Sequence, residues 1–141
     1  MVPQDFSLAS AGALAAGLLV EACGSGDHLR VRTVRDADKD LGRGLSSLSE
    51  AGTPASSVEA ALVCADLATL AASNLPALPN GVWPGAVATT YLAAGTARAL
   101  VTLAEGAFDA GDGVHAHNVL RDARGAGWKA DLAVRQLGGT G

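Results

Sequence analysis

The hydrophobic positions of this chain recur at the three- and four-residue spacing of helices, and no segment sustains the two-residue alternation of a strand. Breaks that contain glycine and proline separate the periodic segments. With 141 residues, the chain has the usual length of one domain. We therefore expect an all-α, single-domain bundle (1–141) of about five helices, over Ser7–Cys23, Asp27–Ala51, Ser56–Asn74, Pro84–Phe108 and Val114–Leu137.

Two of these segments have little polar surface. Pro84–Phe108 carries only two charged residues, Arg98 and Glu105, and a helix that is apolar all round is normally covered on several sides. In the first helix, the spacing of Leu14, Leu18 and Leu19 suits a core face. Because a lone five-helix bundle would leave much of this apolar surface exposed, we expect the chain to form a homodimer packed through its helices.

Four polar residues form a stripe along the helix that begins at Pro84. Tyr91, Arg98, Thr102 and Glu105 follow one another at spacings of seven, four and three, which places them on one arc. One interpretation is the solvent-facing edge of the helix. The other is a ligand-facing stripe, in which Arg98 orients an anion and Glu105 or Tyr91 transfers a proton.

A single acidic residue interrupts an apolar stripe in the second helix. Val34, Asp38, Leu41 and Leu45 follow helical steps, so the stripe includes Asp38. A carboxylate placed there would lose its hydration and its pKa would rise, which suits a general acid or base. The alternative is an acidic helix face, shared with Asp36 and Asp40, on which Asp38 lies near the edge.

Composition and charge exclude several classes of protein. The net charge is −4, and no basic stripe with interleaved aromatic residues points to nucleic acid. Cys23 and Cys64 are too few for a disulfide framework, and we expect buried free thiols in the cytoplasm. The apolar run Leu8–Cys23 is too short for a membrane span, and the residues before it lack the positive charge of a signal peptide. We expect no membrane partner.

The histidines do not predict a metal site. On a helix, His115 and His117 would point about 200° apart, which prevents them from sharing one ion. His28 stands alone beside a glycine turn. We therefore expect neither a metal nor a cofactor.

Several segments together resemble successive helices of the cyclodeaminase/cyclohydrolase family. They include VRDADKDLGRGL (Val34–Leu45), the Thr53–Leu75 segment and GAVATTYLAAGTARALVTLAEGAF (Gly85–Phe108). This family includes the C-terminal domain of formiminotransferase-cyclodeaminase and methenyltetrahydrofolate cyclohydrolases. The resemblance implies an all-α fold that dimerises through its helices. It also implies a folate-derived substrate, on which water-driven ring opening, or ring closure with loss of ammonia, takes place.

The chain departs from the family pattern at three places. The glycine-rich turn before the first helix is replaced by Asp5-Phe6-Ser7-Leu8-Ala9, and the Ser-Asp pair that opens the long helix by Trp83-Pro84. Two asparagines late in that helix correspond here to Thr102 and Gly106. The chain thus resembles a diverged member of the family.

Three functions follow as expectations. The first is a lyase or hydrolase of the cyclodeaminase/cyclohydrolase type, acting on a small cyclic or imine-bearing substrate. The second is a different elimination, cyclisation or hydration on the same fold, and the third is a non-catalytic helical homodimer or partner subunit. In the enzyme, Arg98 would hold a carboxylate and Trp83 would cover a planar ring. The candidate catalytic residues are Asp38, Asp36 and Glu105, and the candidate substrate-binding residues are Arg98, Tyr91, Trp83 and Thr102.

Overall fold

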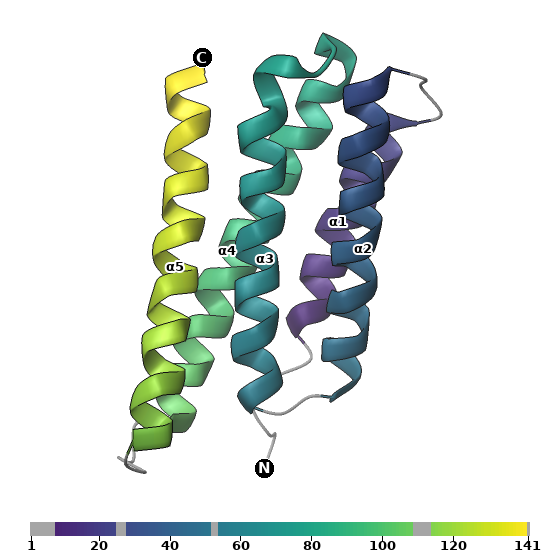
Figure 1. The fold of residues 1–141 in the computed structure, drawn as a ribbon. Coiled ribbons are helices and arrows are strands. Elements are labelled where there is room, and N and C mark those ends of the chain that lie inside the picture. Colours follow the sequence, from purple (N-terminus) through teal and green to yellow (C-terminus); the bar gives the residue numbers. More distant parts are fainter. Residues whose placement is uncertain (1–7, 25–27, 52–53, 109–113, 141) are drawn as a thin grey trace.

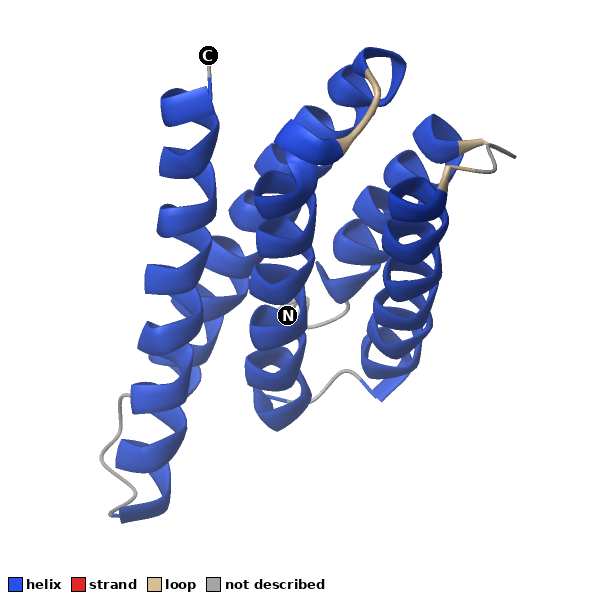
Figure 2. Cartoon of the chain, turned by 45° about the horizontal axis from the view of Figure 1, so that its top comes forward, coloured by secondary structure: helices blue, strands red, loops and turns tan. Residues whose placement is uncertain are grey.

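The computed structural model describes residues 8–24, 28–51, 54–108 and 114–140, and it confirms an all-α bundle (Figure 1). Over these ranges the chain forms five α-helices and no strand (Figure 2). Two short 3₁₀ turns, Leu75–Ala77 and Asn80–Val82, lead into the fourth helix. The helices are α1 (Ala9–Cys23), α2 (Leu29–Ala51), α3 (Pro54–Asn74), α4 (Trp83–Phe108) and α5 (Val114–Thr140).

The helices run alternately up and down, so α1, α3 and α5 point the same way (Figure 1). In that view α5, α3 and α2 form a front layer, and α4 and α1 lie behind it. Helix α3 packs against each of the other four helices, whereas α2 packs on α1 and α3, and α4 packs on α1, α3 and α5. The expectation that the apolar segment from Pro84 is covered on several sides is therefore met by three neighbouring helices.

Small residues allow the helices to approach closely. A Cβ atom added at Gly12 of α1 would lie 2.5 Å from the Cys64 sulfur on α3, and one at Gly85 of α4 would lie 2.2 Å from the Ala22 Cβ on α1. Both distances are far below van der Waals contact, so only glycine fits there. Most buried residues of α4 and α5 are also alanines, namely Ala86, Ala93, Ala94, Ala97, Ala104, Ala123, Ala126, Ala130 and Ala133.

Hydrogen bonds also connect neighbouring helices. The buried hydroxyl of Thr89 on α4 donates a hydrogen bond to the Ala15 carbonyl on α1, at 3.0 Å. At the end of the bundle, the Arg30 guanidinium on α2 donates to the Asn74 side-chain oxygen on α3, at 3.1 Å. Each contact links residues far apart in the sequence, so each fixes the position of one helix along another.

The start of α3 and the end of α5 differ from the sequence prediction. Helix α3 begins at Pro54 rather than at Ser56, because proline has no N–H to lose in the first turn and is favoured there. Helix α5 continues past Leu137 to Thr140, since glycine weakens a helix without ending it. The expected starts at Ser7 and Asp27 lie outside the described residues.

Leu14 was expected in the core, and the structure places it on the surface. Its side chain is 64% exposed, whereas Leu19 is fully buried as expected. The buried face of α1 instead includes Gly12, Ala15 and Ala16. In this bundle the small residues mark the helix contacts, because they permit the closest approach, so side-chain size is a poor guide to burial.

Two helical segments, Ser56–Ala77 and Asn80–Gly106, are long and apolar enough to cross a membrane. This is weak evidence, because the core helices of soluble bundles have the same length and composition. About half of each segment, 56% and 50% respectively, is buried against the rest of the bundle.

The close approach at Gly85 leads to a test with a matched control on the same helix. We expect Gly85→Ala to lower the free energy of unfolding by roughly 1–3 kcal/mol, since the added methyl group would overlap Ala22. At Gly95, where an added Cβ meets nothing within 4 Å, alanine should instead raise it by up to about 1 kcal/mol. Urea denaturation measures both values. Equal effects of the two substitutions would contradict the packing described above.

Candidate functional site

Asp38 lies on the face of α2 that packs against the bundle, which agrees with the first of the two interpretations of its position in the sequence. Its side chain is 0% exposed, and Val34 and Leu45 on the same stripe are also buried. Neither of its carboxylate oxygens has a hydrogen-bond partner among the described residues. Buried polar groups are nearly always paired, so a carboxyl group left without a partner requires an explanation.

Asp38 is one of the residues that line a cavity of about 390 Å³ between α1 and α2, and its carboxylate oxygens lie buried beneath the cavity surface. Gly42 of α2 lies close to α1, since a Cβ added there would be 3.1 Å from the Ala16 Cβ. Gly17 of α1 has open space in front of it, so the lack of a side chain there widens the cavity. The lining residues are Ala13, Ala16, Gly17 and Val20 of α1, and Asp38, Lys39, Gly42, Arg43 and Ser46 of α2.

The apolar surroundings change the acidity of this carboxyl group. Burial raises the pKa of Asp38 from its usual 3.8 to about 7, and a weak interaction with the Val20 backbone, which falls short of a full hydrogen bond, opposes the rise only in part. Burial, together with the negative charge of Asp38, also raises the pKa of Cys23, while Arg35 lowers it. Near neutral pH, Asp38 therefore exists in both protonated and ionised forms, which suits proton transfer.

Cationic side chains surround the opening of the cavity. Lys39 and Arg43 both belong to its lining, and Arg43 forms an ion pair with Asp40 on the outer side of α2. Lys39 has no ion pair within the described part of the chain. The cavity thus combines a buried acid with an exposed positive charge.

The other candidates on α2 and at the start of α4 lie elsewhere. Asp36 is exposed and does not line the cavity. Trp83 is half-buried, and its indole N–H donates to the Leu78 carbonyl at 2.9 Å. Trp83 therefore anchors the turn before α4, and its N–H is already occupied by this contact.

The four residues of the polar stripe on α4 share one face, as the spacing predicts, and all four are exposed. Tyr91 is 56% exposed. The Arg98 guanidinium lies 3.8 Å from the Asp131 carboxylate on α5, and Thr102 donates to the Arg98 carbonyl at 3.0 Å. Glu105 has no ion pair among the described residues. The stripe is thus a solvent-facing edge, with Arg98 directed toward α5.

The structure does not bring the polar stripe and Asp38 into one site. The cavity at Asp38 is lined by α1 and α2 alone, whereas Arg98 lies at the contact between α4 and α5. Sequence periodicity assigns each residue to a face of its own helix, but it does not say which faces meet. Gly17 and Gly42 were the missed signal, because Gly42 lets α2 approach α1 and the missing side chain at Gly17 leaves space beside this contact.

Within the described ranges, no three His, Cys, Asp or Glu side chains lie close enough to hold a metal ion. Cys23 and Cys64 are buried free thiols, as expected, and burial raises the pKa of Cys64 to about 12. Comparison of the chain with protein-family models, curated proteins and solved structures finds no match. The resemblance to the cyclodeaminase/cyclohydrolase family therefore stays a prediction.

The buried acid predicts a pH-dependent stability. Because the pKa of Asp38 is raised in the folded protein, its stabilising contribution is present below the unfolded value of 3.8 and is lost as pH rises through about 7. Relative to Asp38→Asn, the wild type should lose on the order of 4 kcal/mol between about pH 4 and about pH 8. Urea denaturation at both pH values measures the difference.

Asp36→Asn is the control, since Asp36 is an exposed carboxylate on the same helix. Its free energy of unfolding should follow that of the wild type at both pH values. If Asp38→Asn gave the same pH dependence as the wild type, the Asp38 carboxyl group would not be desolvated.

Proposed function

We propose that the cavity between α1 and α2 binds a small molecule with an imine or basic nitrogen, and that Asp38 exchanges a proton with this nitrogen. The observation that carries the proposal is the fully buried carboxyl group of Asp38, a residue of the cavity lining, which has no hydrogen-bond partner among the described residues. An ionised carboxylate buried without a partner is costly. A ligand nitrogen that shares or accepts the proton of Asp38 would remove this cost.

The proposed reaction is acid/base-assisted hydrolysis, elimination or ring closure, as in a lyase or hydrolase. The Asp38 carboxylic acid gives its proton to the imine nitrogen, which makes the neighbouring carbon electrophilic. Water adds to that carbon, and the Asp38 carboxylate takes a proton from the added water. Asp38 then returns this proton to the nitrogen of the adduct, and the carbon–nitrogen bond breaks as the hydroxyl group forms a carbonyl and gives its proton to the Asp38 carboxylate. This cleavage opens the ring or releases an amine, and the reverse steps close a ring. A pKa near the working pH serves both directions.

The charges around the cavity favour a substrate that also carries an anionic group. Lys39 has no ion pair in the described part of the chain, and Arg43 lies beside it in the lining. A carboxylate on the substrate could bind these cations while its nitrogen reaches Asp38. A folate-derived compound, the substrate class that the sequence resemblance implies, combines such a ring with carboxylates.

The setting that we propose is a cytoplasmic homodimer without a cofactor. The buried free thiols Cys23 and Cys64 suit a reducing compartment. Water and the substrate supply every atom of the proposed reaction, so it requires no cofactor.

An alternative function is that of a non-catalytic homodimer or partner subunit. The exposed Leu14 lies on α1, next in sequence to Ala13 of the cavity lining. A second chain that covers Leu14 could place a cation near Asp38. If this is the function, Leu14→Glu should convert a dimer to a monomer in sedimentation equilibrium, since it would bury a charge in the contact. A monomeric wild type would contradict this alternative.

Turnover and binding test the proposed enzyme. We expect the wild type to change the absorbance of methenyltetrahydrofolate and to melt at a higher temperature with folates present. Asp38→Asn should lower kcat by at least about 100-fold, because its amide cannot supply the proton. Asp36→Asn, an exposed carboxylate outside the cavity, should retain activity.

A second pair of variants tests the location of the site. Gly17→Leu places a side chain into the open space of the cavity. Gly44→Leu on α2 also places a side chain into open space, but Gly44 does not line the cavity. Gly17→Leu should abolish folate binding in the thermal-shift assay, and Gly44→Leu should leave it unchanged. If the wild type shows neither an absorbance change nor a thermal shift with folates, the folate-based form of the proposal is wrong. Equal binding by both variants would exclude this cavity.

A further inference from the structure

A second ligand site is indicated on the other side of the bundle, where Trp128 of α5 is 65% exposed. An indole ring offers a large apolar surface and readily stacks on other flat rings. Single exposed apolar residues are common and need no explanation. What distinguishes Trp128 is its surroundings, which form a cavity and carry an excess of positive charge.

The cavity beside Trp128 has a volume of about 560 Å³ and lies between α3 and α5. Gly125, one turn before Trp128, contributes to it by its lack of a side chain, since an added Cβ would meet nothing within 4 Å. Leu132 and Ala133 provide further apolar lining. The complete lining is Thr69 of α3 and Gly125, Trp128, Lys129, Leu132, Ala133 and Gln136 of α5.

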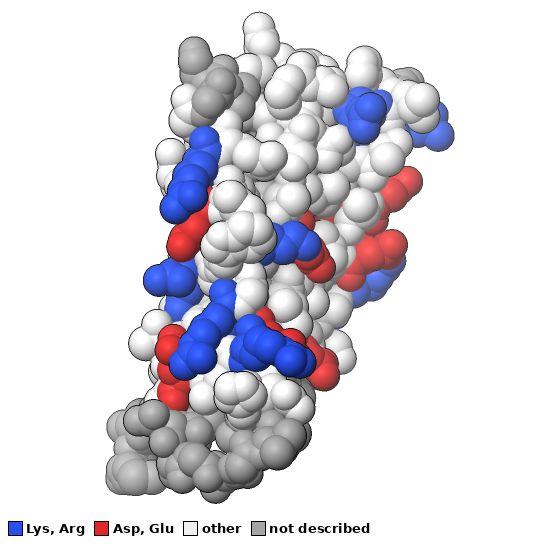
Figure 3. Space-filling view, turned by 60° about the vertical axis from the view of Figure 1, so that its left-hand side comes forward, with Lys and Arg blue, Asp and Glu red and all other residues white. Residues whose placement is uncertain are grey.

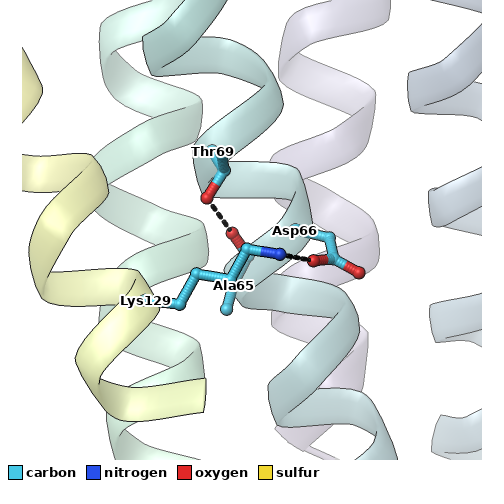
Figure 4. A network of polar contacts seen from close by, with 4 residues as sticks. All are labelled: Ala65, Asp66, Thr69 and Lys129. Carbon is cyan, nitrogen blue, oxygen red and sulfur yellow. Dashed lines mark hydrogen bonds and ion pairs between the residues drawn. The ribbon is translucent and has the colours of Figure 1, made fainter. Parts of the chain in front are cut away.

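Two polar contacts between α3 and α5 hold the cavity in shape. Lys129 forms an ion pair with Asp66 (Figure 4), and two turns further along, Ser73 donates to the Gln136 side-chain oxygen at 3.2 Å. Both contacts join residues 63 positions apart, as expected for parallel helices in constant register. Between them, Thr69 donates its hydroxyl proton to the Ala65 carbonyl of its own helix (Figure 4). The cavity is therefore formed before any ligand binds.

The helix face that carries Trp128 is locally basic. Three arginines lie close to Trp128 around α5. Arg121 and Arg135 are seven residues from it and Arg124 is four, so all three lie within about 40° of it around the helix. All three are exposed, and none has an ion pair among the described residues. Figure 3 shows this side of the molecule, on which cationic and acidic groups are interspersed.

The acidic residues of α5 do not neutralise this face. Asp131 is engaged by Arg98, and Asp122 lies about 120° around the helix from Trp128. The whole chain has a net charge of −4, so a positive face on α5 is not a consequence of overall composition. It favours an anionic ligand over a cationic one.

We infer that the α3–α5 cavity binds a small planar aromatic molecule that carries an anionic group. Its ring stacks on Trp128 and enters the space at Gly125, and its anionic group lies among the cations of α5. This site is separate from the Asp38 cavity, and the inference does not depend on the proposed function. A small ligand matches the volume of this open cavity, about 560 Å³.

A matched pair of fluorescent probes distinguishes stacking on Trp128 from binding of the anionic group. 8-Anilinonaphthalene-1-sulfonate and N-phenyl-1-naphthylamine share their aromatic rings, and only the first carries a sulfonate. We expect the sulfonate probe to bind about fivefold tighter at low salt, and this preference should shrink as salt screens the arginines. The readouts are the gain of probe fluorescence and the quenching of Trp128 emission, the latter taken as the difference between the wild type and Trp128→Phe.

Two glycines of α5 supply the matched variants. Gly125→Leu would fill the cavity and should weaken both probes by at least about tenfold, while Gly138→Leu should bind them as the wild type does. Both glycines face open space, but only Gly125 lines the cavity. Arg124→Gln should reduce the affinity of the sulfonate probe alone. Circular dichroism melting of each variant checks that the fold is retained.

Three results would overturn the inference. Equal binding to Gly125→Leu and Gly138→Leu would place the probes outside the cavity. Equal affinities of the two probes at low salt would remove the anionic part of the recognition. A dimer of the wild type that becomes a monomer in Trp128→Ala would assign this face to a second copy of the chain.

Discussion

The close approach of the helices is the constraint on which the rest of this structure depends. At Gly12 and Gly85, the neighbouring helix occupies the space that a Cβ would need, and alanines line most of the remaining buried surface of α4 and α5. Large side chains would separate the helices and open cavities between them. The apolar composition of α4 thus serves contacts with three neighbouring helices and does not require a membrane.

The candidate site follows from the same constraint. Gly42 brings α2 close to Ala16 of α1, and this proximity removes water from Asp38, which lies one turn earlier on α2. The absence of a side chain at Gly17, by contrast, leaves space that α2 does not fill. Close packing and an unfilled space next to each other produce a carboxyl group that is desolvated and still borders a cavity. Close packing alone would make Asp38 an inert core residue. An unfilled space alone would make it an ordinary surface acid.

The sequence predicts the features that depend on neighbouring residues, and it does not predict those that depend on contacts between helices far apart in the chain. Helix number follows from local periodicity and was predicted, and the buried position of Asp38 was one of the two interpretations that the periodicity allowed. The exposure of Leu14 was missed because glycine and alanine, rather than leucine, form the close contacts of α1. Arg98 was placed on the right face of α4, but its partner Asp131 belongs to another helix. Contacts between helices that are distant in sequence leave no periodic signal, so the grouping of Arg98 with Asp38 could not be tested from the sequence.

The hydrogen bond from Thr89 to the Ala15 carbonyl has a consequence for how the helices slide. A contact surface made of alanine and glycine is smooth, with few protruding side chains to interlock. Such helices can shift along their axes at little cost in apolar contact. The resistance to sliding then comes from local close fits, such as Gly85 against Ala22, and from directional bonds, of which Thr89–Ala15, Arg30–Asn74 and the Ser73–Gln136 contact are three. In this bundle, apolar packing sets how close the helices lie, and polar bonds between them add to the fits that set their axial alignment.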